Sequence, residues 1–276
     1  MGKNWLRGKN VIITGASSGI GAHLARLLLA LDCKVLGVSR KADKAKDFAD
    51  SLNNPSYSYY CFDVGVESEW VKFSEHLKEI SFLPDVVINN AGIMPAFKRA
   101  QDVEVEVFEK VTSINYFSAI YSYTHLSPLL SESKTPSIIN VSSSSALATL
   151  VGTAPYIASK TALRAYTECL YTERKDMYIA VVCPGFTKTE IFRDQKQGVD
   201  DGIIGLVSMP ADKMARKILK RIRRRKRRIV VGIDAHLMSG FYRLFPKLST
   251  RLIAWVLKKT KLPLFDGIFN PDNNKR

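Results

Sequence analysis

The chain has 276 residues, of which 46% are hydrophobic and 24% charged, a composition typical of a globular protein that excludes a chain disordered throughout. Its formal net charge is +15, and much of the excess lies in one basic run, Arg216–Arg228, which bears on partners and solubility rather than on the fold. The four cysteines lie far apart in the sequence without metal-ligand spacing, so we predict neither a disulfide framework nor a metal site.

Short apolar runs alternate with segments of helical periodicity along most of the chain. The first ten residues lack the apolar stretch of a signal peptide, so we expect a cytoplasmic protein. The predicted strands are Lys9–Thr14, Lys34–Ser39, Tyr57–Phe62, Asp85–Asn89, Ser137–Val141 and Tyr178–Cys183. The predicted helices are Gly19–Leu31, Ala42–Leu52, Glu67–Ile80, Val103–Leu129 and Ala154–Lys175. This alternation predicts an α/β fold, a doubly wound parallel Rossmann-type sheet flanked by helices.

Residues suited to ligand binding follow the predicted strands at the point where each strand ends. In a parallel sheet of this kind, a ligand binds beyond the carboxyl ends of the strands, near the point where the strand order reverses. The residues at those ends are Gly15, Arg40, Asp63, Asn90, Ser143 and Pro184. Because these ends meet at one edge of the sheet, we expect the residues to form one site.

A glycine-rich turn, Thr14–Gly21, joins the first strand to the first helix. Glycines allow a tight turn and the close approach of a phosphate, and the helix N-terminus adds unpaired N–H groups and a positive dipole end. We therefore expect a dinucleotide to bind at Gly15, Ser17, Ser18, Gly19, Ile20 and Gly21. The alternative is a tight turn whose glycines only allow the helix to pack on the strand.

The end of the second strand indicates which dinucleotide to expect. An acidic residue there would bind the ribose hydroxyls of NAD and repel the 2′-phosphate of NADP. The sequence has Ser39 and Arg40 instead, followed by Lys41, with no acid before Asp43. Arg40 can make a charged contact to a phosphate, and Ser39 can add a hydrogen bond. We therefore favour NADP(H) and keep NAD(H) as the alternative, in which Arg40 and Lys41 simply begin a solvated helix.

A tyrosine and a lysine four residues apart, Tyr156 and Lys160, follow a serine-rich segment, Asn140–Ser145. Residues at this spacing share one helical face. A tyrosine titrates near pH ~10, but a nearby ammonium and the positive ring of an oxidised nicotinamide would lower its pKa and make Tyr156 a usable base. A serine hydroxyl at the strand end could polarise the substrate oxygen. The competing interpretation of the pair is an exposed, amphipathic helix face.

Three motifs in the same order make the chain similar to the short-chain dehydrogenase/reductase family. They are a T-G-x-x-x-G-x-G turn at Thr14–Gly21, N-N-A-G at Asn89–Gly92 and Y-x-x-x-K at Tyr156–Lys160. The similarity runs from about Lys9 to Thr189, and the motifs together are more specific than any one of them. The resemblance implies an enzyme that transfers a hydride between a nicotinamide dinucleotide and a carbonyl compound or alcohol, here as an NADP-preferring member.

The resemblance also implies a role for each matching residue. Tyr156 would be the acid in reduction and the base in oxidation, Lys160 would hold the nicotinamide ribose and lower the pKa of Tyr156, and Ser143 would orient the substrate oxygen. Asn115 would position a water for proton relay to Lys160. The other residues that would contact the cofactor are Asp63, Val64, Asn90, Ala91, Gly92, Pro184, Gly185, Thr187 and Thr189.

The loops after the strand ends would form the substrate pocket, with a lid at about 186–209. The residues expected to line it are Met94, Ser145, Leu150, Val151, Phe186 and Phe192. Because most of these are apolar, we expect an apolar ketone or secondary alcohol resembling a lipid, a steroid or a fatty-acyl compound. One competing function is an NAD-preferring alcohol dehydrogenase. The other is a non-catalytic dinucleotide-sensing or nucleic-acid-binding protein, and the complete set of Asn115, Ser143, Tyr156 and Lys160 argues against this second one.

Residues 1–233 are expected to form one dinucleotide-binding and catalytic domain, and residues 234–276 a basic, amphipathic helical extension. The extension mixes apolar and basic side chains, as interfacial helices do, and is too interrupted to span a bilayer as one helix. With the basic run beside it in the sequence, it favours an anionic membrane surface as a partner. The alternative is a segment that covers the pocket or an oligomer interface.

Two further expectations concern macromolecular partners. By resemblance, the helices Val103–Leu129 and Ala154–Lys175 would pair two or more subunits, giving a homodimer or homotetramer. The basic run Arg216–Arg228 has no interleaved aromatic residues and matches no nucleic-acid motif, so we expect no nucleic-acid partner.

Overall fold

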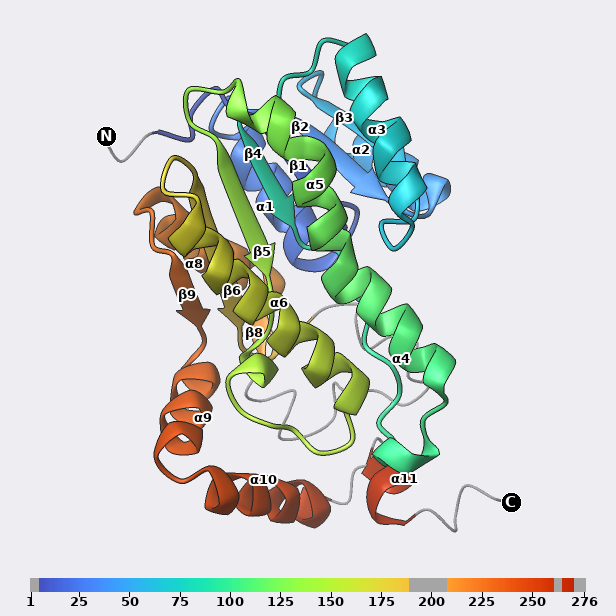
Figure 1. The fold of residues 1–276 in the computed structure, drawn as a ribbon, viewed down its shortest axis with the longest axis vertical. Helices are drawn as coiled ribbons and strands as arrows, with labels where there is room; N and C mark the ends of the chain where they lie inside the picture. The colour runs from blue at the N-terminus through green and yellow to red at the C-terminus, as the bar shows by residue number, and fades with distance from the viewer. Residues whose placement is uncertain (1–4, 189–207, 261–264, 271–276) are drawn as a thin grey trace.

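A seven-stranded sheet forms the centre of the computed structural model, which describes residues 5–188, 208–260 and 265–270 (Figure 1). Its strands are β1 (Asn10–Thr14), β2 (Lys34–Ser39), β3 (Tyr57–Cys61), β4 (Val86–Asn89), β5 (Ser137–Val141), β6 (Tyr178–Pro184) and β9 (Arg228–Val231). All neighbours are parallel, in the order β3-β2-β1-β4-β5-β6-β9, so the order reverses between β1 and β4. A separate parallel pair joins β7 (Thr187–Lys188) to β8 (Met209–Pro210).

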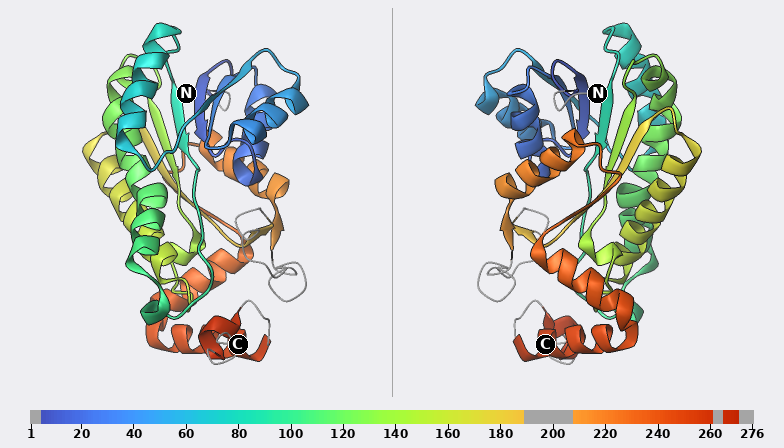
Figure 2. Two further views of the ribbon diagram at one scale, coloured as in Figure 1. Left: turned by 90° about the vertical axis from the view of Figure 1, so that its right-hand side faces the viewer. Right: turned by 90° about the vertical axis from the view of Figure 1, so that its left-hand side faces the viewer.

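Helices cover both faces of the sheet (Figure 2). One face carries α1 (Gly19–Leu29), α2 (Ala42–Leu52) and α8 (Ala211–Arg223). The other carries α3 (Glu67–Glu79), α4 (Val105–Thr112), α5 (Ser118–Ser131) and α6 (Ala154–Glu173). Short 3₁₀ turns occupy Ala100–Asp102 and Ser144–Ala146. Because both faces are covered, the central strands are almost wholly apolar, and the predicted fold class is confirmed.

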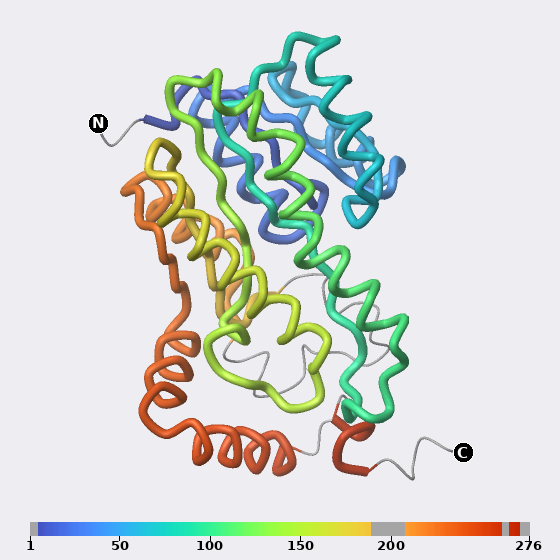
Figure 3. Tube along the Cα trace, viewed as in Figure 1, coloured from blue at the N-terminus to red at the C-terminus, as the bar shows by residue number. Residues whose placement is uncertain are grey.

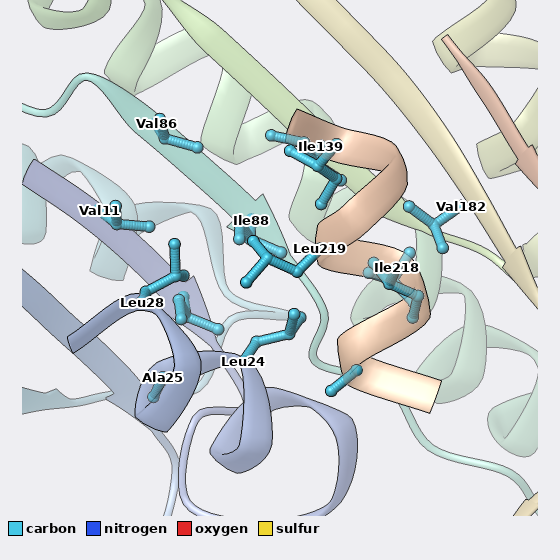
Figure 4. Packing of buried hydrophobic residues seen from close by; sticks show 14 of the residues in the cluster. Val11, Leu24, Ala25, Leu28, Val86, Ile88, Ile139, Val182, Ile218 and Leu219 are labelled. Carbon is cyan, nitrogen blue, oxygen red and sulfur yellow. The ribbon is translucent and has the colours of Figure 1, made fainter. Parts of the chain in front are cut away.

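The core on one side of the sheet is a contact between α1, α8 and the strands (Figure 4). Leu24 and Leu28 of α1 and Ile218 of α8 have no exposed surface, and they pack with Val11 and Ile88 of the sheet. Apolar residues recur every three or four positions on both helices, so each helix turns one apolar face to the sheet.

The six predicted strands are all present, and each end differs from the predicted one by no more than one residue. The seventh strand, β9, is not predicted by the sequence. Its three apolar residues, Ile229–Val231, directly follow the basic run and are too few to stand out from it. In the structure Ile229 and Val231 are buried, and β9 extends the sheet by pairing with β6.

The helix predicted at Val103–Leu129 is a continuous helical stretch from Val105 to Ser131, but a turn of π-helix, Ser113–Phe117, separates α4 from α5. A π turn contains one more residue than an α turn, and such turns are often found at functional sites. Asn115 lies in this turn and is 1% exposed. The sequence periodicity does not predict the interruption.

The basic run Arg216–Arg228 ends far from the C-terminal extension, contrary to what their adjacency in the sequence suggests. Arg225 stacks on the rings of Trp5 at 4.5 Å and Tyr178 at 5.4 Å, and Arg227 donates a hydrogen bond to the Tyr171 carbonyl. These contacts lie at the amino ends of the strands. Strand β9 then runs along the edge of the sheet to its carboxyl end, where the extension begins (Figure 1), so these arginines and the extension lie at opposite ends of β9.

The C-terminal extension folds back over the carboxyl ends of the strands (Figure 3). It forms α9 (Ile233–Leu244), α10 (Pro246–Thr260) and α11 (Asp266–Phe269), and Pro246 marks the break between the first two. A small apolar cluster joins it to the body of the protein, with Phe97 and Phe265 in edge-to-face contact at 5.1 Å. Among the described residues, no helix is long and apolar enough to cross a membrane.

We predict that Ile218→Ala lowers the free energy of unfolding by about 2–5 kcal/mol, because truncation leaves a cavity between α8, α1 and the sheet. Ile80→Ala is the matched control, since it removes the same atoms from a side chain that is 47% exposed, and it should cost less than about 1 kcal/mol. Urea unfolding followed by circular dichroism measures both variants. Equal losses would contradict the packing described.

Candidate active site

A cavity of about 430 Å³ opens at the carboxyl ends of the central strands. It brings together most of the residues that the sequence singles out, namely Gly15, Ser17, Ser18, Gly19, Ile20, Ser39, Arg40, Asp63, Val64, Asn90, Ala91, Gly92, Met94, Ser143, Ser145, Leu150, Tyr156, Lys160, Pro184, Gly185, Phe186 and Thr187. Gly21, Asn115 and Val151 lie outside its wall. Thr189, Phe192 and most of the expected lid, 186–209, lie outside the described residues.

The glycine-rich turn lies directly against the end of β4. Gly15 has φ +66°, a conformation that favours glycine, and a side chain there would come within 3.0 Å of the Ala91 backbone. The side-chain amide of Asn90 donates to the carbonyls of Thr14 at 3.0 Å and Gly15 at 3.2 Å. Gly21 lies behind the turn, where a side chain would collide with the Gly15 carbonyl. Helix α1 therefore starts at the cavity wall with its positive dipole end toward the cavity.

One end of the cavity is strongly cationic. Arg40, Lys41 and Lys44 line it together with Ser39, whose buried hydroxyl has no hydrogen-bond partner among the described residues. Asp63 is the only carboxylate of the described wall, and it accepts a hydrogen bond from the Gly65 backbone at 2.9 Å. Lys44 is not among the predicted residues, although it follows Arg40 by four positions and could have been found from that spacing.

Tyr156 lies on the cavity wall together with Ser143. Burial raises the pKa of Tyr156, and the nearby Ser143 hydroxyl only partly opposes this. The sequence predicts a lowering in the presence of Lys160 and a bound, oxidised nicotinamide. In the protein alone burial has the larger effect, and the lysine amine donates to the Val141 carbonyl at 3.0 Å.

Lys160 is 3% exposed, and its burial lowers the pKa of the amine to about 8. The Ser142 hydroxyl donates to the Lys160 carbonyl at 2.7 Å, which ties this turn of α6 to the end of β5. A side chain at Gly92 would lie 3.1 Å from the lysine amine, so the Asn90–Gly92 segment passes close to it.

Asn115 supports the wall of the cavity from behind. Its amide exchanges two hydrogen bonds with the Ile93 backbone, at 2.8 and 2.9 Å, and donates a third to the Ser159 hydroxyl at 3.1 Å. Ser159 in turn donates to the Tyr156 carbonyl at 2.8 Å. In this structure Asn115 therefore connects the segment after β4 to the helix that carries Tyr156.

The other end of the cavity is more apolar. Met94, Leu150 and Phe186 line it with Ser145, whose buried hydroxyl has no hydrogen-bond partner in the part of the chain that the structure describes. Val151 packs nearby in the apolar cluster under the C-terminal extension rather than on the wall. Met238 of α9 also lines the cavity. The sequence leaves open whether the extension covers the pocket, and in the structure part of it does.

Asp234, at the start of α9, holds the segment after β6. Its carboxylate accepts a hydrogen bond from the Phe186 backbone N–H at 2.7 Å. A side chain at Gly185 would come within 2.3 Å of that carboxylate, so glycine is needed for this close approach. The Gly185 N–H also donates to the Val231 carbonyl at 2.7 Å. No local sequence pattern singles out Asp234, because its partner lies 48 residues earlier.

In the described part of the chain, no group of three or more His, Cys, Asp or Glu side chains could hold a metal ion. The cysteines there are free thiols. The polar groups of the described cavity wall are hydroxyls, amines, the Arg40 guanidinium, the Asn90 amide, one carboxylate and backbone N–H groups, which suit an anionic nucleotide and acid–base chemistry.

Comparisons with known proteins point to one family. The family model for short chain dehydrogenase matches residues 9–200. The chain is 30% identical over 200 residues to dehydrogenase/reductase SDR family member 7B of Rattus norvegicus, covering 68% of this chain and 61% of that relative. It is 28% identical over 268 residues to the fatty acyl-CoA reductase of Acinetobacter baylyi, covering 90% and 88%.

A solved structure has the same fold. It is the X-ray structure of an alcohol dehydrogenase from the archaeon Thermococcus sibiricus, complexed with 5-hydroxy-NADP. The TM-score is 0.71 at 21% sequence identity, and the match covers 81% of this chain and 96% of that one.

The low pKa of Lys160 predicts a pH-dependent stability. Below about pH 8 both folded and unfolded chains hold the proton, and the buried ammonium costs about 3 kcal/mol. Between about pH 8 and 10.5 the unfolded chain binds more protons, so stability rises with pH. Lys160→Met should therefore stabilise the protein at pH 7 and lose this advantage as the pH rises toward 10.5.

Urea unfolding of wild type and variant at pH 7, 8.5 and 10 measures this effect. Lys78→Met, at an exposed position on α3, is the matched control and should show no such trend. A constant difference between Lys160→Met and wild type across this range would contradict the assigned burial of the amine.

Proposed function

Because the chain belongs to the short-chain dehydrogenase family, we propose that it interconverts an apolar ketone and its secondary alcohol with NADP(H). The family makes it an NAD(P)-dependent dehydrogenase or reductase. The observation that carries the finer proposal is the arrangement of Tyr156, Ser143 and Lys160 on the wall of one cavity that also reaches the glycine-rich turn. The nicotinamide supplies the hydride when bound, and the protein supplies the proton.

Tyr156 is proposed to transfer that proton. The raised pKa of Tyr156 keeps the phenol protonated at neutral pH, the form required to donate to a carbonyl oxygen during reduction. Ser143, on the same cavity wall as Tyr156, can donate to the same oxygen and polarise the carbonyl. In the oxidative direction the phenol has to lose its proton first, and a positive ring beside it would favour that loss.

The remaining roles are proposed for the residues that surround this pair. Lys160 would hold the nicotinamide ribose. Asn115 would either position the cavity wall through its hydrogen bonds to the Ile93 backbone and Ser159, or position an ordered water for proton relay to Lys160. The cofactor would lie along the residues of the glycine-rich turn and of the strand ends after β3, β4 and β6. Thr187 lies on the cavity wall, and we propose both Thr187 and Thr189 as cofactor contacts.

The cationic end of the cavity supports NADP(H) as the preferred cofactor. Arg40, Lys41 and Lys44 can neutralise a 2′-phosphate, and the Ser39 hydroxyl can donate to it. The structural relative from Thermococcus sibiricus is complexed with an NADP derivative. NAD(H) remains the alternative, in which Arg40 and Lys41 would have no 2′-phosphate to contact.

The apolar end of the cavity supports a lipid-like substrate. Met94, Leu150, Phe186 and Met238 provide an apolar wall, and Ser145 a single hydroxyl. The relative from Acinetobacter baylyi is named for a fatty-acyl substrate, which is consistent with such a wall. A screen of ketones and alcohols of graded chain length with NADPH and NADP⁺ would identify the class.

We also propose a homodimer or homotetramer formed through α4 and α5, which follow one another end to end, and α6, which lies beside them (Figure 1). Val105 of α4 and Phe117 of the π turn are 67% and 40% exposed, as expected of an unpaired interface. Residues 1–233 are proposed as the catalytic unit, to which the extension adds Met238 and Asp234.

Tyr156→Phe should reduce the turnover of the best ketone about 10²–10⁴-fold, because it removes the proton donor and keeps the ring. NADPH binding, followed by fluorescence, should be retained. Ser143→Ala should also lower turnover, and Ser145→Ala less so. Near-normal turnover in Tyr156→Phe would contradict the assignment and favour a non-catalytic, dinucleotide-sensing protein.

Arg40→Asp should reverse the cofactor preference, because the carboxylate repels a 2′-phosphate and can bind ribose hydroxyls. A charged hydrogen bond is worth about 1.5–3 kcal/mol, so the ratio of the NADPH and NADH dissociation constants should change at least about tenfold. Lys78→Asp introduces the same charge on α3, away from the cavity, and should leave the ratio unchanged. A wild-type preference for NADH would refute the proposal.

A further inference from the structure

The outer side of α9 and α10 carries an apolar ridge, which we define as Leu237, Leu244, Phe245, Leu248, Leu252 and Trp255. Leu244 is 72% exposed and Trp255 58%. Large apolar side chains scattered singly over a surface need no explanation, but a continuous group on two consecutive helices indicates a binding surface. The ridge lies at the end of the molecule beyond the carboxyl ends of the strands (Figures 1 and 2).

Helix α10 has three distinct faces. Its inner face, at Ser249, Ile253 and Leu257, is turned to the protein, where the last two pack in the small apolar cluster. Leu248, Leu252 and Trp255 recur at helical spacing and form its part of the ridge. Lys247, Arg251 and Lys258 form a third, exposed stripe beside them. A helix with an apolar stripe flanked by cations is the pattern of helices that lie in a membrane interface.

The charge on these two helices is one-sided. Five cations, Arg243, Lys247, Arg251, Lys258 and Lys259, are all exposed. The single carboxylate, Asp234, is turned inward to the Phe186 N–H. The Lys259 amine lies 5.4 Å from the centre of the Trp255 ring, so cation and aromatic ring are paired as they are at headgroup level.

This charge distribution decides between two possible occupants. In a two-fold dimer the same patch meets itself, so five cations would face five cations without an opposing acid. An anionic lipid surface presents negative headgroups to the cations and an apolar interior to the ridge. We propose that the α9–α10 ridge docks this enzyme peripherally on an anionic lipid bilayer. In this proposal the cations of α10, and not the distant basic run Arg216–Arg228, attract the anionic headgroups.

The proposal is tested with vesicles of phosphatidylcholine alone and with added phosphatidylglycerol, using the full chain. Wild type should co-sediment with the anionic vesicles and weakly with the neutral ones. Lys247→Ala with Arg251→Ala should lower the partition coefficient about 25-fold, at about fivefold for each cation. Leu248→Ser, Leu252→Ser and Trp255→Ser together should lower it at least about tenfold, because each apolar side chain adds to binding.

Matched controls on α3 are Val71→Ser with Ile80→Ser, which are 40% and 47% exposed, and Lys78→Ala. They should bind as wild type does. Trp255 gives an independent signal, since Trp70 is buried and Trp5 partly so. Its fluorescence should shift to the blue with anionic vesicles, and Trp255→Phe should lose the shift while still binding.

Two results would overturn the proposal. One is that wild type sediments with neither kind of vesicle. The other is that the ridge variant binds vesicles as wild type does but has a smaller mass by light scattering, which would make the ridge a subunit interface. Activity on a short, water-soluble ketone, measured for every variant, reports separately on the proposed chemistry.

Discussion

The hydrogen bonds between the ends of β1 and β4 are the interaction on which the site depends. The chain leaves these two strands toward opposite faces of the sheet, so the backbone groups at their ends have no regular ladder to pair with. The Thr14 hydroxyl accepts from the N–H groups of Asn90 and Ala91, both at 3.0 Å, and the Asn90 amide returns two bonds to the turn. This tie fixes Gly15 on one side of the cavity and Gly92 on the other.

Burial acts on the two titratable groups of the site in the same sense. It raises the pKa of Tyr156 and lowers that of Lys160, so in each case it favours the neutral form. The protein alone therefore holds an uncharged phenol and a readily deprotonated amine within a few residues of each other. The charge of a partner that enters the cavity beside them would therefore change the pKa of both groups.

The sequence predicts most of the sheet and the position of the site, because an apolar run followed by a polar residue marks each strand end. It does not predict β9, whose three apolar residues follow a run of cations. It also does not predict Asp234 and Met238, which belong to the site only because the chain returns to it after β9. Such contacts depend on tertiary packing, and no local spacing encodes them.

The π turn at Ser113–Phe117 also affects how two subunits could fit together. One additional residue advances the helix by about 100° of rotation, so a side-chain stripe that faces outward on α4 does not continue in line on α5. If two copies paired along this helix, their contacting side chains could not form one straight row. In the proposed subunit interface the row would change at the level of Asn115, so deleting one residue from the turn would shift the register of the cavity wall and of that interface together.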